Sequence, residues 1–468
     1  MGPLIRFEIK KAVKSRKNRI VLAIYCILIA SMIFSKIDEG ARQRTENISN
    51  FLFLEDYYKL DHTTYGNRAK QFDAPLFKIY SDNAAIRAEY YGQKAKTMLE
   101  RDVYAELDAD IKHYENELKF YTEDVKSLVD SGQLLKGLPS RYMDYPSRLL
   151  SSPDMRQNAV DYYRLQHEFL TSLRDNNIKP MDRYEMTGYA FLYSAFDELL
   201  PPIALLIALL VLSDIMSGEA DSGSFKFLLL QPLPRGKVVL AKTIAAFLIT
   251  LMWLLVPLFV AFLFLGLVNG FGNPNYPVLY LKGSFTSLKA PSAAPNYDGA
   301  YLGRGFFSRV SWERDTAFLG AEYRHGHFYL GYSKYASEYG YFLYYALPNK
   351  ELVLIPIAIF LLRCLVPITL FALFAAALAV FVSILTRKGV ISIVVGTLIG
   401  VMFTIFTIQP ERMNLSKAFN PLAYKNPIVL LSGLGGVTTL LGAFVLCICS
   451  VLLFVLAYRI FNKRDIIC

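Results

Sequence analysis

Six long apolar stretches alternate with polar segments along the chain, at residues 20–37, 193–216, 243–268, 352–385, 390–408 and 437–461. An α-helix rises about 1.5 Å per residue, so roughly 20 apolar residues cross the hydrocarbon layer of a bilayer. Lipid offers no hydrogen-bond partner to backbone groups, and a helix satisfies those groups internally. The pattern therefore predicts an α-helical polytopic membrane protein with six transmembrane helices.

Two polar segments between the stretches are much longer than connectors, at residues 38–192 and 269–350. In the first, apolar residues recur every three or four positions from Val103 to Leu128, and a second such stripe runs from Met155 to Leu173. These stripes predict two long helices that pair as an antiparallel hairpin, and the alternative is one solvated, charged helix. The second segment is rich in Asn, Gly, Pro and Tyr, which favours short strands and loops.

The composition supports lipid as the solvent for much of the chain, since 54% of its 468 residues are hydrophobic and 19% are charged. No A-x-A-like cleavage site follows the first stretch, so we interpret it as a span and not as a signal peptide. Basic residues gather at 6–19, 226–242, 387–388 and 459–464. The positive-inside rule places these segments and both termini in the cytoplasm. Topology and contact with anionic lipids explain the net charge of +10, and nucleic acid need not be invoked.

The expected organisation follows from these signals. The cytoplasmic parts are a basic amphipathic helix, a loop after the second span and a tail, at 1–19, 217–242 and 462–468. The spans are 20–37, 193–216, 243–268, 351–386 with an outer extension, 390–408 and 437–461. The outer parts are a helical domain, a smaller mixed or β-like segment and a short loop, at 38–192, 269–350 and 409–436.

The fourth stretch is too long for one perpendicular crossing, and counting back from its inner end leaves Arg363 near the outer boundary. Asp197 and Glu198 lie at a similar depth in the second span. Charges at membrane depth seek partners, so one hypothesis pairs Arg363 with Asp197 or Glu198. The alternative is that each side chain reaches water separately.

The sequence offers no catalytic, cofactor-binding or metal-binding constellation. It has no G-x-x-x-x-G-K-[ST] phosphate loop, no H-E-x-x-H and no G-x-S-x-G. His325 and His327 lack acidic or Cys neighbours, so we do not expect a metal site there. The five cysteines lie in or beside the predicted spans or at the terminus, and the outer segments have none. Energy for any transport must come from another subunit.

The loop after the second span begins with acidic residues, continues as an apolar patch at 225–230 and ends with Pro232 and Pro234. A polar start and a proline stop around an apolar run predict a short interfacial helix. Such a helix can rest on the membrane or insert into a partner.

The pattern E-x-D-x-G-S-x-x-x-x-L-L-x-P-x-x-R-x-x-x-x-x-A-K resembles the first cytoplasmic loop of permeases from type-2 ABC exporters. Its positions here are Glu219, Asp221, Gly223, Ser224, Leu229, Leu230, Pro232, Arg235 and Lys242. The basic N-terminus before the first span resembles the elbow helix of that family. The ending FNKRDI and the short outer loop between the last two spans also fit. The two large outer segments depart from compact members and leave the substrate class open.

The resemblance implies a transport subunit without its own ATPase. Two permeases, identical or related, would form the pathway in the membrane lipids, and two ABC ATPase subunits carrying ATP and Mg would dock below. A coupling helix would contact the ATPase through Glu219, Asp221, Gly223, Ser224, Phe225, Leu229, Leu230, Pro232 and Arg235. The resemblance places the chain in a bacterial plasma membrane.

Three functions remain open from the sequence. The leading one is export or extraction of an amphipathic substrate, such as a peptide, a bacteriocin, an antibiotic or a lipid-linked compound. The second is a mechanical or sensory role in which the ATPase moves the outer domain without translocation. The third, a polytopic membrane enzyme, lacks a convincing constellation.

Overall fold

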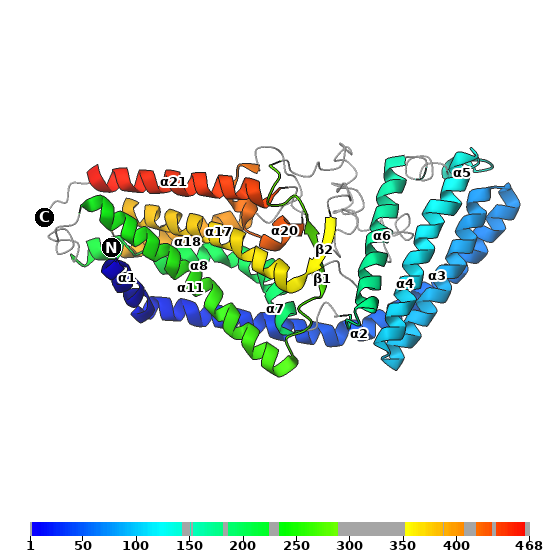
Figure 1. Cartoon of the computed structure of the whole chain (residues 1–468), viewed down its shortest axis with the longest axis horizontal. Helices are drawn as coiled ribbons and strands as arrows, with labels where there is room; N and C mark the ends of the chain where they lie inside the picture. The colour runs from blue at the N-terminus through cyan, green and yellow to red at the C-terminus, as the bar shows by residue number, and fades with distance from the viewer. Residues whose placement is uncertain are drawn as a thin grey trace.

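Two helical bundles joined end to end make up the elongated molecule (Figure 1). The computed structural model describes residues 2–142, 150, 153–180, 186–223, 234–288, 352–386, 388–406, 418–432 and 437–463. We call the half that contains α1, α7, α8, α11, α17, α18, α20 and α21 the apolar bundle. The half that contains α3, α4 and α6 is the polar bundle. Helix α2 takes part in both.

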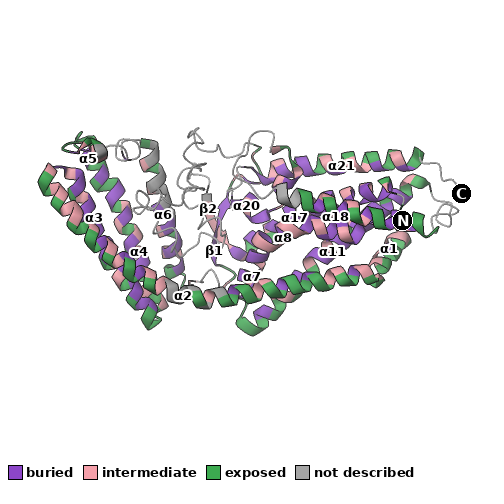
Figure 2. Ribbon diagram, turned by 180° about the vertical axis from the view of Figure 1, so that it is seen from behind, coloured by how far each residue is buried: buried purple, intermediate pink, exposed green. Residues whose placement is uncertain are grey.

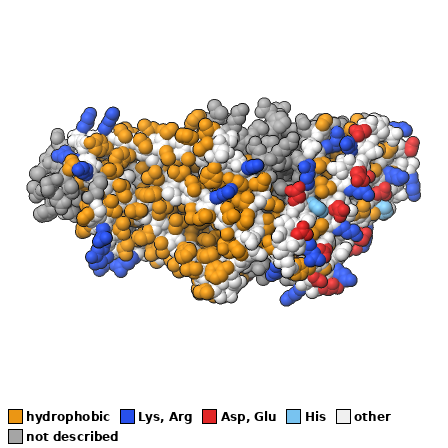
Figure 3. All heavy atoms as spheres, viewed as in Figure 1, with side chains coloured by type: hydrophobic (Ala, Val, Ile, Leu, Met, Phe, Trp, Pro, Cys, Tyr) orange, Lys and Arg blue, Asp and Glu red, His pale blue; other side chains and the backbone are white. Residues whose placement is uncertain are grey.

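Five helical segments of the apolar bundle are long and apolar enough to cross a membrane, as judged by length and composition. They are Arg16–Asp38, Gly188–Asp221, Arg235–Asn269, Ile357–Leu385 and Thr439–Lys463. A sixth helix, α18 (Gly389–Phe406), contains a shorter described apolar run, Gly389–Met402. Hydrophobic side chains cover this bundle as a broad band, whereas side chains of both charges cover the polar bundle (Figure 3). The chain is therefore a multi-pass helical membrane protein.

The second span is composed of several helical pieces. Helix α7 (Gly188–Ser194) continues through a π-helical turn (Ala195–Leu199) into α8 (Leu200–Leu212), and α9 (Ser217–Asp221) follows a turn. The helix begins five residues before the predicted 193 because its first N–H groups have acceptors. The amides of Gly188 and Tyr189 donate to the carbonyls of Gly270 and Phe271, at 3.1 and 3.0 Å.

Two helices begin at other residues than the predicted spans do. Helix α11 (Arg235–Asn269) begins directly after Pro234, so the residues up to Lys242 belong to its first turns and not to the preceding loop. Helix α17 (Ile357–Leu385) begins after Pro356, because the residues before it form a strand and not a helical extension. That strand, β2 (Leu352–Pro356), pairs antiparallel with β1 (Pro277–Leu281), with Leu279 opposite Leu354. Residues 289–351, including His325 and His327, lie outside the described residues.

The apolar bundle also contains α1 (Gly2–Lys14), α20 (Pro427–Ser432) and α21 (Thr439–Lys463). Helix α1 and the last turns of α21 lie at the same end of the molecule, opposite the polar bundle (Figure 1). We call this the α1 end. Lys and Arg side chains cluster there (Figure 3).

The helix that contains the first span continues without interruption into the polar bundle. Helix α2 (Arg16–Phe72) continues for 57 residues and changes direction between the bundles (Figure 1). It is followed by α3 (Pro75–Glu100), α4 (Val103–Lys119), a π-helical turn (Phe120–Val125), α5 (Lys126–Asp130) and α6 (Pro153–Asp175). Asp73 and Arg101 end α2 and α3 in the left-handed conformation, with φ of 46° and 60°. This conformation allows the chain to turn tightly from α2 into α3 and from α3 into α4.

Helices α4 and α6 lie side by side and run antiparallel. Arg174, near the end of α6, pairs with Asp108, near the start of α4, at 2.7 Å. The first apolar stripe in the sequence runs through α4, the π-helical turn and α5, and the second belongs to α6. The stripes did not reveal that α3 also packs on α4, or that α2 packs on α3.

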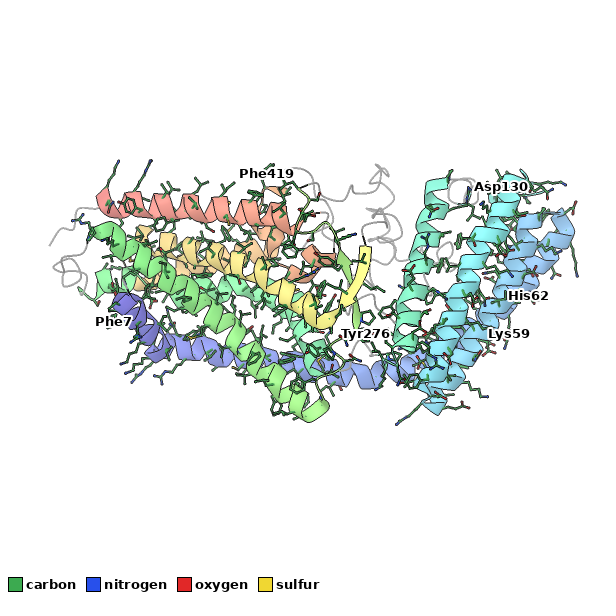
Figure 4. The ribbon with its side chains drawn as sticks, in the orientation of Figure 1. Phe7, Lys59, His62, Asp130, Tyr276 and Phe419 are labelled. Carbon is green, nitrogen blue, oxygen red and sulfur yellow. The ribbon has the colours of Figure 1, made fainter. Side chains whose placement is uncertain are left out.

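The two bundles share a hydrophobic junction at β1. Phe169 of α6 packs edge-on against Tyr276, with ring centroids 5.9 Å apart, and both rings are buried. Figure 4 shows Tyr276 at the boundary between the bundles, and Figure 2 shows buried residues continuing through this region. The polar bundle is thus held both by the chain connection through α2 and by apolar packing of α6.

Candidate functional site: a buried ion-pair node at the α1 end

Lys242 lies at the centre of a group of buried charges at the α1 end. Its ammonium donates to Glu8 at 2.6 Å and to the carbonyl of Ile215 at 3.1 Å, and it pairs with Glu219 at 2.8 Å. The Lys242 side chain is 0% exposed. Two of the three N–H donors of the ammonium thus have acceptors in Glu8 and Ile215, and the Glu219 carboxylate adds an ion pair. The lysine therefore joins α1, the turn before α9, and α9 itself to α11.

Lys11 completes this group, which we call the node (Glu8, Lys11, Glu219 and Lys242). Its ammonium lies 2.8 Å from Glu219. Partial burial lowers the pKa of Lys11, but the hydrogen bond and negative charge of Glu219 outweigh it, so the pKa lies above its usual value. Two lysines face two glutamates, and the node is neutral overall. Such pairing is what makes buried charge tolerable.

The amphipathic character of α1 explains why Glu8 points inward. Ile5 and Ile9 pack against the core of the apolar bundle, and Glu8 lies on the same side with 2% exposure. Phe7, by contrast, is 58% exposed and points away from the bundle (Figure 4). A second pair beside the node joins Lys17 of α2 to Asp214 at 2.5 Å. The segment 213–223, which we call the coupling segment, is thus held by α1, α2 and α11.

Helix α18 also contacts the coupling segment. The hydroxyl of Ser392 donates to the carbonyl of Ser213, and a Cβ on Gly389 would lie 3.6 Å from the Cα of Gly218. Small residues permit this close approach. The coupling segment is therefore fixed within the bundle, although it follows the end of a span.

The predicted coupling residues fall into four groups. Glu219 is buried and its carboxylate faces Lys11 and Lys242, which corrects the picture of a surface group directed at a partner. Asp221 and Gly223 are exposed. Arg235 lies on the first turn of α11, where it donates to the carbonyl of Asn462 at 3.4 Å. Ser224, Phe225, Leu229, Leu230 and Pro232 lie outside the described residues.

The hypothesis of an ion pair between Arg363 and Asp197 or Glu198 is not supported, because the structure gives these groups other contacts. Glu198 pairs with Lys36 of α2 at 2.7 Å. Asp197 accepts a hydrogen bond from the side-chain amide of Asn426 at 2.9 Å. The Arg363 guanidinium lies 4.6 Å from the ring centroid of Tyr280 and, within the described ranges, makes no ion pair with either carboxylate. The sequence could not reveal Lys36 as the partner of Glu198 or Asn426 as the partner of Asp197, because these residues are far apart along the chain.

Sequence reasoning did not single out Glu8 and Lys11 as members of the node. A signal for Glu8 was available, since it is the one acid in a helix with four basic residues. Lys242 was noted only as a motif position. No group of three or more His, Cys, Asp or Glu side chains that could hold a metal occurs in the part of the chain that the structure describes.

The fold and the node define the class: a helical membrane subunit whose coupling segment is held at one end of its spans, with no phosphate loop in its sequence. The family model of the ABC-2 family transporter proteins matches residues 3–466, nearly the whole chain. The chain belongs to this family. Membership implies a permease subunit that works with an ABC ATPase. No curated protein and no solved structure matches the chain.

Proposed function

We propose that this chain is the permease of an ABC exporter that moves or extracts an amphipathic substrate: a peptide, a bacteriocin, an antibiotic or a lipid-linked compound. Two copies, or this chain and a related one, form the pathway. Two ATPase subunits with ATP and Mg dock at the α1 end, which faces the cytoplasm of a bacterial cell. The polar bundle stands on the outer side.

The observation that carries this proposal is the way the node holds the coupling segment. Lys242 ties Glu8 and Glu219 together across more than 200 residues of sequence. A segment that is fixed to α1, α2, α11 and α18 moves these helices when the ATPase displaces it. A free loop would change its own conformation and leave the spans in place. Glu219 acts in this proposal by positioning the segment, and exposed Asp221 and the residues after it contact the ATPase.

Reconstitution with the ATPase tests the function. Liposomes that contain the permease and its ATPase should show ATP hydrolysis stimulated by amphipathic ligands, together with movement of the stimulating ligand across or out of the membrane. Failure of the two subunits to associate would overturn the proposal.

The coupling segment has its own test. Glu219→Gln should weaken ligand-stimulated hydrolysis while the protein still inserts, because the neutral amide no longer balances two lysines. Glu115→Gln, an exposed carboxylate on α4 of the polar bundle with no part in the proposed ATPase contact, is the control for charge removal. Equal activity of Glu219→Gln and the wild-type protein would show that the node does not position the segment.

A mechanical role without translocation is the second candidate. The packing of Phe169 on Tyr276 favours it, since the polar bundle touches the ends of the spans directly. In liposomes, ATP hydrolysis that moves the polar bundle but no ligand would favour this second function.

A further inference from the structure

Helix α9 of the coupling segment has no side-chain cap of its own. Its N-cap residue is Met216, which offers no oxygen to the first N–H groups of the helix. A helix leaves these N–H groups without an intrahelical acceptor, and Ser, Thr, Asp or Asn at the N-cap usually supplies one. The cap of α9 must come from elsewhere.

Ser383 of α17 supplies it. Its hydroxyl oxygen accepts the N–H of Met216 at 3.0 Å and the N–H of Ser217 at 3.1 Å. Ser383 is 167 residues away in sequence and fully buried. A side chain of α17 therefore accepts hydrogen bonds from the start of α9, which is the role that an N-cap side chain normally has in its own helix.

The other end of α17 is capped by a different segment. The N–H groups of Ile357 and Ala358 donate to the carbonyls of Tyr276 and Pro274, at 2.8 and 3.1 Å. Pro356 connects the helix directly to β2, which pairs with β1. The ring of Tyr276 in turn packs against Phe169 of the polar bundle. A continuous series of contacts thus runs from the coupling segment through α17 to α6.

Helix α17 is better suited than α2 to carry a displacement between the ends. Both helices connect the α1 end with the junction. In the most apolar window of α17, 67% of the residues are buried, against 17% in that of α2. A helix that is packed on most sides moves with its neighbours as a unit, whereas α2 lies at the edge of the bundle and changes direction (Figure 1).

We propose that Ser383 is a positioning residue that fixes the coupling segment to α17, and that α17 carries the movement of this segment to the polar bundle. The ATPase stroke at the α1 end thereby changes the position of the polar bundle through β1, β2 and Phe169. This inference rests on the proposed function for the source of the movement. It adds the path and the residue at its inner end.

The test measures the distance between spin labels at Lys119 of the polar bundle and Lys463 of α21, in the full chain bound to its ATPase. Both positions are exposed. In the wild-type protein, trapping the ATPase with nucleotide should shift the distance distribution. Ser383→Ala should lose this shift and retain ATPase binding and basal hydrolysis, while Ser383→Thr, which keeps the hydroxyl, should restore it.

Ser450→Ala is the matched control, because Ser450 is also buried in a span but donates to the Leu446 carbonyl within its own helix. If Ser383→Ala fails to fold, Phe169→Leu breaks the outer end of the same path and should also abolish the shift. A wild-type shift that persists in Ser383→Ala and Phe169→Leu, or no shift in the wild-type complex, overturns the inference. Loss of ATPase association in the wild-type protein would instead overturn the proposed function.

Discussion

The node at the α1 end and the core of the polar bundle both contain buried ion pairs, but the pairs connect different kinds of neighbours. In the polar bundle, Arg87 binds Glu117 with contacts of 2.7 and 2.5 Å, and Lys94 binds Asp110 at 2.5 Å. These pairs join α3 to α4, which are consecutive in the chain. The node joins α1, α9 and α11, which are far apart in sequence.

Buried ion pairs therefore have two different structural roles in this protein: they join consecutive helices in the polar bundle, and they join distant segments in the node. Paired residues on consecutive helices fix the register of a hairpin, and an apolar pair of similar volume does the same. In the node, one lysine serves two carboxylates and a carbonyl from three segments, so no single replacement conserves the arrangement. The polar bundle should therefore tolerate the exchange of its ion pairs, whereas the node should not.

Removing Lys242 should have the largest effect. Lys242→Met leaves Glu8 and Glu219 buried beside a single remaining lysine, and we expect a loss of at least about 3–5 kcal/mol in the free energy of unfolding. Thermal unfolding of the solubilised full chain would measure it, and hydrogen exchange should locate the loss in α1 and α9. Lys237→Met, exposed on the same helix, is the control. The additional exchange Glu219→Met should restore little, because Glu8 remains unmatched.

Arg87→Met should cost a similar amount or slightly less, about 3 kcal/mol, because Glu117 is left buried without its bidentate partner. The double variant Arg87→Met and Glu117→Met should recover most of this loss. Thermal unfolding and hydrogen exchange in α3 and α4 would compare the variants. A double variant as unstable as Arg87→Met would remove the contrast between the two regions.

The stability of the polar bundle should depend on pH through the carboxyl group of Asp61. Burial raises the pKa of its carboxyl above the ordinary 3.8, and the hydrogen bond from Tyr57 only partly opposes this. The folded state then binds a proton more tightly than the unfolded state, so this group's contribution to stability decreases as pH rises from 3.8 through the raised pKa. Unfolding measured from pH 3 to pH 7 should give a less negative slope for Asp61→Asn. An unchanged slope would contradict the raised pKa.

Lys11→Gln should have the smallest effect, below about 1 kcal/mol, because the Lys11 side chain is 46% exposed and solvent screens its pair with Glu219. Its pKa is raised, so its stabilisation is complete below pH 10.5 and is lost as pH rises through the folded pKa. High salt should reduce the difference between the variant and the wild-type protein. A loss as large as that of Lys242→Met would place the centre of the node at Lys11.

Much of the apolar bundle could be predicted from the sequence, because each span is a local property of about 20 residues. The helices α4 and α6 could be predicted for the same reason, because an apolar stripe is also a local property of the sequence. The boundaries at Gly188 and Ile357 could not be predicted, because the first N–H groups of both helices donate to carbonyls of other segments.

The candidate site was predictable in part. The motif pointed to Glu219 and Lys242, but it could not show that these two residues bind each other or that Glu8 completes the arrangement. Burial of Glu219 reversed the expected direction of its side chain. A sequence pattern specifies which residues occur, whereas the direction of a side chain depends on which helices surround it.

The sequence by itself determined that this protein lies in a membrane, that it lacks a phosphate loop and that its loop after the second span resembles those of ABC permeases. These are properties of composition and short-range pattern. The tertiary structure alone decided that Lys242 pairs with Glu8 and that Ser383 caps α9. Hydrogen bonds and ion pairs act over about 3 Å, and only the packing of distant helices brings such groups that close.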